Sequence, residues 1–221
     1  MSAKGRAKVV ARRLVDGAGA MVGHAQLRWS IRGARDRTIT VLDIDNTLAD
    51  TWPSYLEDWP DHRLRLRALA ELSGMRAAVY EPAVRRGDVV VFLSHRNWWE
   101  WGLTRKWLLD HGYAVPTASL VLVPSAAAKV AHLSRLTRAR TVVYWDDLSH
   151  GQESGTPQRY DEVVTAVRAL RLEYHGVDEI EAIVAAAGSV TCAPWPTSSE
   201  RWGTPAGDSP CCGTSPVPST G

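Results

Sequence analysis

Short apolar segments alternate with longer segments of helical character between residues 37 and 188, and this alternation constrains the fold more than any other feature. The apolar segments, predicted to be strands, are Thr38–Leu42, Val89–Leu93, Leu120–Val123, Thr141–Tyr144 and a short fifth at Leu172–Tyr174. The predicted helices between them are His62–Arg86, Trp98–His111, Ala126–Thr137, Arg159–Leu170 and Val177–Ala187. Strands without polar alternation are typical of parallel strands covered on both faces. The pattern predicts an α/β fold, a three-layer doubly wound parallel sheet of Rossmann-like type.

Two segments of different composition flank this predicted domain of residues 37–188. Residues 1–37 carry nine Lys and Arg and two Asp, whereas the rest of the chain carries 17 Lys and Arg and 22 Asp and Glu. Residues 1–36 are therefore interpreted as a basic, partly helical extension, either a solvated helix or an arm with weak affinity for an anionic partner. Residues 189–221, rich in Pro, Ser, Thr and Gly, are predicted to be a disordered tail.

The positions of the cysteines and the hydropathy of the chain indicate the cellular compartment. The three cysteines, Cys192, Cys211 and Cys212, all lie in the tail, so no disulfide framework supports the predicted core. No apolar run predicts a transmembrane segment, and no signal peptide is recognisable. We therefore expect a cytoplasmic protein.

Polar residues that suit a metal ion and a phosphate group follow four of the predicted strands. They are Asp43, Asp45 and Thr47 after the first strand, Ser94 after the second, Lys129 on the helix after the third, and Asp146 and Asp147 after the fourth. Ligands of open α/β sheets bind beyond the carboxyl ends of the strands. Clustered carboxylates repel one another unless a cation or a proton lies between them, and Mg²⁺ prefers oxygen ligands. The pattern predicts metal-assisted phosphoryl chemistry.

At these residues the chain resembles the haloacid dehalogenase superfamily of phosphohydrolases. Asp43-Ile44-Asp45-Asn46-Thr47 is similar to its first motif, D-x-D-x-T after an apolar strand. Ser94 is similar to the second motif, Lys129 to the third, and Asp146-Asp147 to the fourth in its two-aspartate form. The resemblance covers about residues 37 to 188, and it implies the core fold of that superfamily. His95 after Ser94, and the lack of a Gly before Asp146, depart from the commonest pattern.

The resemblance also implies a role for each residue. Asp43 would be the nucleophile that forms an aspartyl-phosphate, and Asp45 the general acid and base. Mg²⁺ would be held by the side chains of Asp43 and of one or both of Asp146 and Asp147, and by the backbone carbonyl of Asp45. Thr47, Ser94 and Lys129 would bind the phosphoryl group. An Asp at position 45 is typical of phosphatases rather than dehalogenases in this superfamily.

Loop lengths and tryptophans give hints about the substrate. About 40 residues separate Leu48 from Val89 and about 25 separate Ser94 from Leu120, which leaves room for little or no cap domain. In the superfamily that the chain resembles, so small a cap implies a phosphorylated small molecule or a nucleic-acid end as the substrate. Ten tryptophans stand against a single Phe. Trp101 and Trp107 are interpreted as anchors of a helix, whereas Trp52 and Trp98 either stack on a substrate or pack in the core.

Three functions remain open from the sequence. The first is a Mg²⁺-dependent phosphomonoester hydrolase acting through an aspartyl-phosphate. The second is a polynucleotide 3′-phosphatase of nucleic-acid repair. The two-aspartate fourth motif and the minimal cap resemble the phosphatase domains of polynucleotide kinases, and the basic extension suits a nucleic-acid substrate. The third is a non-catalytic binding or scaffold protein in which residues 1–36 are the working part.

Overall fold

The computed structural model describes residues 36–138, 140–151 and 157–188, with a few isolated positions at 25, 28, 29, 31, 32 and 154. Predictions for the basic extension and for the tail therefore lie almost wholly outside the described residues. Within them, no helix combines the length and the apolar character needed to cross a membrane.

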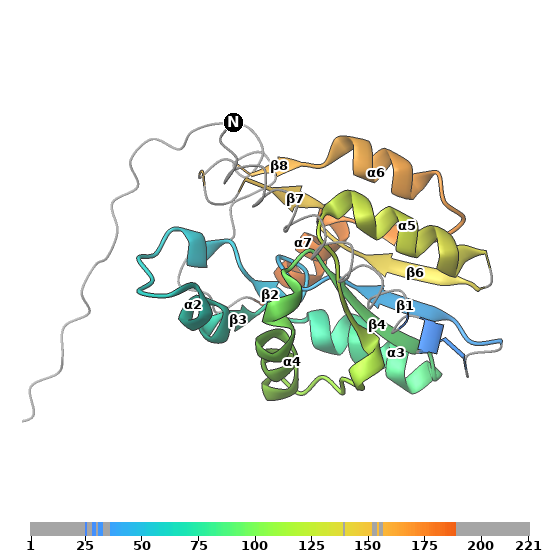
Figure 1. Ribbon diagram of the computed structural model, residues 1–221, viewed down its shortest axis with the longest axis horizontal. Helices are drawn as coiled ribbons and strands as arrows, with labels where there is room; N and C mark the ends of the chain where they lie inside the picture. Colours follow the sequence, from blue (N-terminus) through green and yellow to red (C-terminus); the bar gives the residue numbers. More distant parts are fainter. Residues whose placement is uncertain are drawn as a thin grey trace, which may run out of the picture.

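A parallel five-stranded sheet forms the centre of the molecule (Figure 1). Its strands are β1 (Ile39–Leu42), β4 (Val89–Ser94), β5 (Leu120–Leu122), β6 (Val142–Trp145) and β9 (Glu173–His175). The strand order is β5-β4-β1-β6-β9, with β1 in the middle. Ile39 pairs with Val89 on one side and with Val142 on the other. The five predicted strands and the α/β Rossmann-like class are thus confirmed, with boundaries that differ by one or two residues.

Helices cover both faces of the sheet (Figure 1). On one face lie α5 (Ala126–Thr137) and α6 (Asp161–Arg168). On the other lie α2 (His62–Ala68), the π-helix η2 (Arg76–Tyr80), α3 (Glu81–Arg86), α4 (Trp101–Asp110) and α7 (Val177–Ala186). Successive side chains of a strand point to opposite faces. Accordingly Ile39 and Val41 pack beneath α5 and α6, whereas Leu42 packs against α4 and α7.

The predicted single helix over residues 62–86 is wrong. The chain instead forms α2, the short strand β3 (Ala70–Glu71), η2 and α3. Helix α2 ends at Ala68 because Leu69 takes an extended ψ of 128°. Gly74, with a φ of +84°, is a second break before η2, because this conformation suits glycine and not a helix. β3 pairs antiparallel with β2 (Ala49–Asp50), which follows β1 directly. This segment, with the 3₁₀ helix η1 (Pro53–Tyr55), lies beside the carboxyl edge of the sheet.

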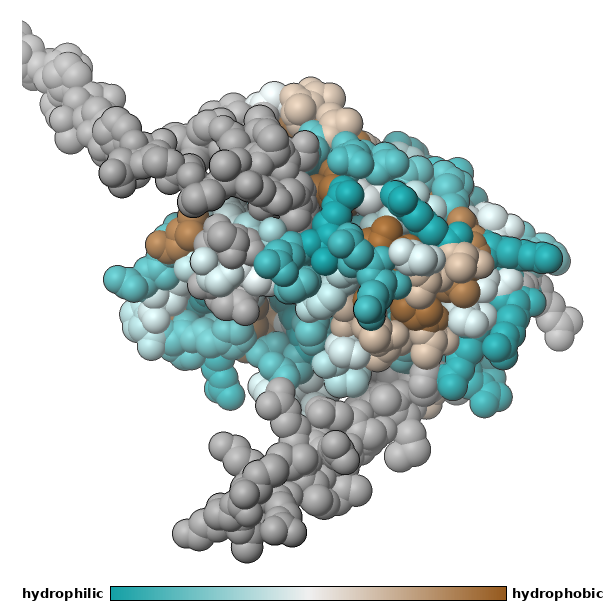
Figure 2. Space-filling model, turned by 90° about the horizontal axis from the view of Figure 1, so that it is seen from above, coloured by the Kyte–Doolittle hydropathy of each residue, from teal (hydrophilic) through white to brown (hydrophobic). Residues whose placement is uncertain are grey.

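A second small addition follows β6. The strands β7 (Ser149–His150) and β8 (Gln158–Arg159) pair antiparallel and form a hairpin before α6. Figure 2 shows that the face carrying α5 and α6 is mainly hydrophilic, with apolar residues among charged ones. This hairpin was not predicted from the sequence, where room for an insertion was expected only after the first and second strands.

The tryptophans divide between core and surface. Trp107 is buried and its indole N–H donates to the Leu69 carbonyl at 2.8 Å, while the Trp101 indole donates to the Leu120 carbonyl at 3.2 Å. Both therefore anchor α4, as predicted. Trp52 is buried, which decides for a packing role. Trp98, in the 3₁₀ helix η3 (Trp98–Glu100), is half exposed.

Candidate functional site

The loop after β1 brings Asp43 and Asp45 to one cavity. Asn46 takes the left-handed conformation, with φ of +54°. The carbonyl of Ile44 then accepts hydrogen bonds from Leu48 N at 2.9 Å and from Ala49 N at 2.8 Å, so the chain coils tightly. In a straight strand, carboxylates two positions apart would lie on the same face but about 7 Å apart along the chain. The coil explains how both Asp43 and Asp45 line the same cavity.

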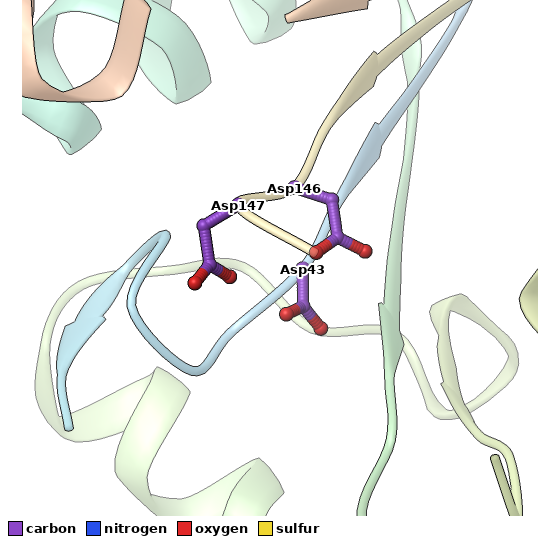
Figure 3. A group of neighbouring side chains, drawn as sticks. All are labelled: Asp43, Asp146 and Asp147. Atoms are coloured by element: carbon purple, nitrogen blue, oxygen red, sulfur yellow. The ribbon is translucent and has the colours of Figure 1, made fainter. Parts of the chain in front are cut away.

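Three buried aspartates meet at the carboxyl ends of β1 and β6. Asp43 follows β1, and Asp146 and Asp147 follow β6, the neighbouring strand. One carboxylate oxygen of each lies within 4.8 Å of the others. Figure 3 shows the three side chains gathered at one place beyond the two strands. The structure therefore brings together the aspartate side chains that the sequence predicted as metal ligands.

Lys129 supplies the positive charge at the centre of this cluster. Its ammonium lies 2.9 Å from Asp43 Oδ1 and 2.6 Å from Asp146 Oδ2, and its side chain is 3% exposed. Burial alone would lower the pKa of Lys129, but Asp146 and Asp43 raise it above its ordinary value, so the side chain is charged. The first turn of α5 carries the lysine because Ser125 caps that helix, its hydroxyl accepting from Ala128 N at 3.1 Å.

One ammonium does not balance three carboxylates. Burial and the charge of Asp146 raise the pKa of Asp43 well above its ordinary value, although Lys129 opposes them. Asp43 Oδ1 is buried and accepts no hydrogen bond of good geometry; its contact with Lys129 is an ion pair. Crowded carboxylates with an oxygen in this state suit a bound cation. The cluster of Asp43, Asp146 and Asp147 could hold a metal ion.

Asp146 and Asp147 have different surroundings. Asp146 Oδ1 accepts from Leu148 N at 2.8 Å, and its Oδ2 accepts from both Lys129 and the Tyr144 hydroxyl. Asp147 Oδ2 accepts from the Ser149 hydroxyl. Asp146 is therefore committed to three protein donors, whereas Asp147 receives a hydroxyl from the hairpin that follows it.

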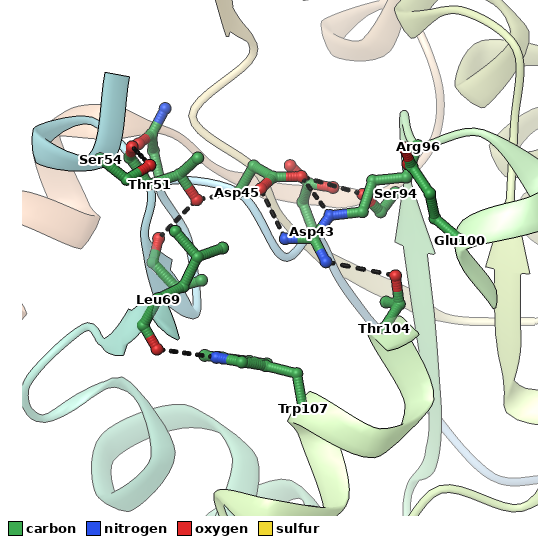
Figure 4. A network of polar contacts seen from close by, with 12 residues as sticks. Asp43, Asp45, Thr51, Ser54, Leu69, Ser94, Arg96, Glu100, Thr104 and Trp107 are labelled. Atoms are coloured by element: carbon green, nitrogen blue, oxygen red, sulfur yellow. Dashed lines mark hydrogen bonds and ion pairs between the residues drawn. The ribbon is translucent and has the colours of Figure 1, made fainter. Parts of the chain in front are cut away.

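Arg96 binds the carboxylate of Asp45 through two hydrogen bonds from its guanidinium. Arg96 Nε donates to Asp45 Oδ2 at 2.8 Å and Nη2 donates to Oδ1 at 2.7 Å, while Thr51 adds a hydroxyl donor at 2.9 Å (Figure 4). Arg96 Nη1 also donates to Thr104 on α4 at 3.2 Å. Burial alone would raise the pKa of Asp45, but Arg96 and Thr51 lower it to about 2. Arg96 and Asp45 therefore form a bidentate ion pair beside the cavity.

Thr47 and Ser94 are buried beneath the cavity. The Thr47 hydroxyl accepts from Asp147 N at 3.3 Å, and the Ser94 hydroxyl donates to Asp45 Oδ2 at 3.4 Å. Neither is among the residues that line the cavity, whereas Lys129 is. The phosphate-binding roles of Thr47, Ser94 and Lys129 stay predictions.

The cavity above the aspartates has a volume of about 240 Å³. Besides the charged residues, its lining includes Thr51 and Tyr55 from the segment after β1, His95 after β4, and Ser149, His150 and Tyr160 from the hairpin region. Burial and Lys129 hold the pKa of His95 below its ordinary value, so its ring is neutral near pH 7. Sequence reasoning missed the hairpin residues, although Gly151 and Pro157, flanking short polar segments, are typical turn signals.

Comparison with models of protein families, with curated proteins and with solved structures gives no match. The function of the chain is therefore inferred from the geometry of the site.

Proposed function

We propose that this chain is a phosphomonoester hydrolase that uses Mg²⁺ and forms an aspartyl-phosphate on Asp43, as the resemblance to the haloacid dehalogenase superfamily implies. The observation that carries the proposal is the buried ammonium of Lys129 between Asp43 and Asp146, with Asp147 beside them. A structural ion pair needs one carboxylate for one ammonium. Three buried carboxylates around one lysine leave negative charge that a metal ion and the reaction itself would use.

Asp43 is the residue placed to attack. Its carboxylate lines the cavity, and Lys129 fixes one of its oxygens at 2.9 Å. In the first step a carboxylate oxygen of Asp43 bonds to phosphorus, and the bond from phosphorus to the ester oxygen breaks. In the second step a water oxygen bonds to phosphorus and the bond to Asp43 breaks, which releases inorganic phosphate. Lys129 stabilises the negative charge on the phosphoryl oxygens in both steps.

The donor set fits Mg²⁺. Asp43, Asp146 and Asp147 offer only oxygen atoms, which this hard cation prefers, and would hold it with their side chains. When bound, the ion supplies positive charge that polarises the phosphoryl oxygens.

Asp45 is proposed to donate a proton to the leaving oxygen in the first step and to accept one from water in the second. The fork of Arg96 keeps Asp45 ionised, which suits the base that takes a proton from the attacking water. The first step needs the opposite state, a protonated Asp45 that gives its proton to the leaving oxygen. A doubly negative phosphate group beside Asp45 raises the pKa of that carboxyl, because like charges disfavour ionisation. Substrate binding thus prepares Asp45 for the acid role.

The test is release of phosphate from p-nitrophenyl phosphate with Mg²⁺, for the full chain and for Asp43→Asn. We expect the variant to lose activity by about 10³-fold or more, since loss of a nucleophile removes the covalent route. Asp110→Asn is the matched control, because Asp110 is an exposed aspartate paired with Lys106 on α4. Acid-quenched wild type should carry a phosphate that hydroxylamine removes, as an acyl phosphate does. Equal turnover by wild type and Asp43→Asn would contradict the proposal.

A further inference from the structure

The cavity has two chemically different ends. The charged residues Asp43, Lys129 and Asp146 are almost fully buried. Four aromatic side chains lie at its more accessible part: Tyr55, His95, His150 and Tyr160. A phosphoryl group belongs with the charged residues, so the group that carries the phosphate meets the aromatic rings. Aromatic faces bind sugar and base rings by stacking and offer little to a short acyclic chain.

The hairpin after β6 holds two of these rings together. The ring centroids of His150 and Tyr160 lie 4.2 Å apart with an angle of 36° between the planes. Tyr160 N donates to the Leu148 carbonyl at 2.9 Å, which continues the pairing of β7 with β8. In this register His150 and Tyr160 are diagonal neighbours on one face of the ribbon.

The hairpin is also tied to the metal-binding residues. Ser149 donates to Asp147, and Asn46 Nδ2 lies 3.4 Å from the Ser149 hydroxyl. Leu148 N donates to Asp146 at 2.8 Å. The distance between the paired rings and the carboxylates is therefore set by short, hydrogen-bonded connections. An aromatic pair fixed in this way can select a leaving group of a given shape.

The size of the cavity limits what it encloses. Its 240 Å³ is below the roughly 300–1,000 Å³ of pockets that enclose drug-sized ligands. This space accommodates a phosphate and about one ring. Any further part of a larger substrate lies outside the cavity.

We propose that the paired rings of His150 and Tyr160 form a subsite for a ring-shaped leaving group, so that the substrate is a phosphomonoester of a sugar or a nucleoside. This subsite rests on the proposed phosphatase function and adds the class of substrate to it. The rings contact the first ring attached to the phosphate by stacking against its apolar face, and they recognise the ring rather than a charge.

The first experiment compares wild-type kcat/KM for thymidine 5′-monophosphate, glucose 6-phosphate and glycerol 3-phosphate at saturating Mg²⁺. All three leave as primary alcohols, so the basicity of the leaving group is matched. We expect kcat/KM for thymidine 5′-monophosphate or for glucose 6-phosphate to exceed that for glycerol 3-phosphate by about tenfold or more. A factor of this size corresponds to one stacking contact. The relative rates of the first two substrates tell a nucleoside from a sugar. Equal kcat/KM for all three overturns the subsite and leaves the proposed function standing; no hydrolysis of any of the three or of p-nitrophenyl phosphate overturns both.

The second experiment uses His150, which is half-buried on the hairpin and is not part of either apolar core. His150→Ala should lower the ratio of ring to acyclic kcat/KM by about fivefold to tenfold, mainly through KM. His150→Phe keeps a flat ring without the imidazole nitrogens and should restore the ratio. A ratio unaffected by His150→Ala overturns the subsite. A ratio as low in His150→Phe as in His150→Ala also overturns it, because the ring would then act through a hydrogen bond.

Discussion

At the scale of single residues, Arg96 determines how Asp45 is presented to the cavity. A guanidinium that donates to both oxygens of a carboxylate fixes its orientation as well as its charge. The Arg96 side chain is 4% exposed and that of Asp45 is 29% exposed, so the arginine is the fixed partner and the carboxylate faces the cavity. Arg96 is a positioning residue in this account, since it acts through Asp45.

Arg96→Ala should therefore impair proton transfer more than attack on phosphorus. Phenyl phosphate and p-nitrophenyl phosphate share a ring but differ in the basicity of their leaving groups. We expect kcat/KM to fall by about 10²-fold or more for phenyl phosphate, which needs a general acid, and clearly less for p-nitrophenyl phosphate. Arg96→Lys should be intermediate, because an ammonium keeps the charge and loses the fork.

Thr104→Val is the matched control for Arg96. It removes only the contact from Arg96 Nη1 and leaves both hydrogen bonds to Asp45 in place. Its rates on the two phenyl esters should keep the wild-type ratio. Added guanidinium should restore part of the activity of Arg96→Ala on phenyl phosphate. The same loss on both esters in Arg96→Ala would show that Arg96 only supports the fold.

Some residues of the candidate site could be predicted from the sequence and others could not. Asp43, Lys129, Asp146 and Asp147 could be predicted because parallel strands bring the residues after their carboxyl ends to one edge. The fork of Arg96 on Asp45 could not, since a side-chain pair depends on rotamers and on the packing of α4 through Thr104. The contribution of Ser149 and the other hairpin residues could not be predicted either. Their positions depend on pairing with β8, a strand of only two residues that leaves little signal in the sequence.

At the scale of elements, the bend between β3 and η2 depends on one glycine. Gly74 has a φ of +84°, and a Cβ added there would lie 2.7 Å from Ala187 Cβ, at the end of α7. Gly87, which ends α3, has a similar φ of +79° and no atom within 4 Å of such a Cβ. The two glycines thus share one backbone requirement and differ in steric contact.

Gly74→Ala should destabilise the protein more than Gly87→Ala. A left-handed alanine costs about 1–2 kcal/mol at either position. Overpacking against Ala187 adds about 1–3 kcal/mol at Gly74 only. Urea unfolding followed by circular dichroism gives both values.

The double variant Gly74→Ala with Ala187→Gly separates the two contributions. It removes the Cβ that the new methyl group meets and should recover most of the difference between Gly74→Ala and Gly87→Ala. If Gly74→Ala and Gly87→Ala cost the same free energy of unfolding, α7 does not pack against this bend as closely as the structure shows.

Elements were predicted well where one pattern dominates a segment. Four of the five strands, β1, β4, β5 and β6, are almost purely apolar, and α5 spans the predicted residues because Ser125 caps it. The single helix predicted over residues 62–86 is wrong because apolar residues recur at helical spacing on both sides of Gly74. Periodicity alone does not show that the chain changes direction between two helical segments. The antiparallel pairing of β2 with β3 is a contact between chain segments about 20 residues apart, which local preference does not encode.

At the scale of the whole molecule, the excess negative charge at the carboxyl edge of the sheet opposes folding. Asp43, Asp146 and Asp147 are each under 5% exposed, and Lys129 forms ion pairs with Asp43 and Asp146. Buried charges that are incompletely paired lower the stability of the native state. A cation that binds only the folded chain relieves this repulsion and stabilises the entire domain.

Mg²⁺ should therefore raise the thermal midpoint of the full chain. At about 100 times its dissociation constant, a ligand that binds only the folded state adds about 2.7 kcal/mol, which corresponds to roughly 5–10 °C for a domain of this size. Differential scanning fluorimetry with Mg²⁺, against EDTA and against NaCl of equal ionic strength, measures the shift. Asp147→Asn should lose most of it, and Asp110→Asn should keep it. An equal shift with NaCl would mean that the salt only screens the three carboxylates, and the proposed metal site would be wrong.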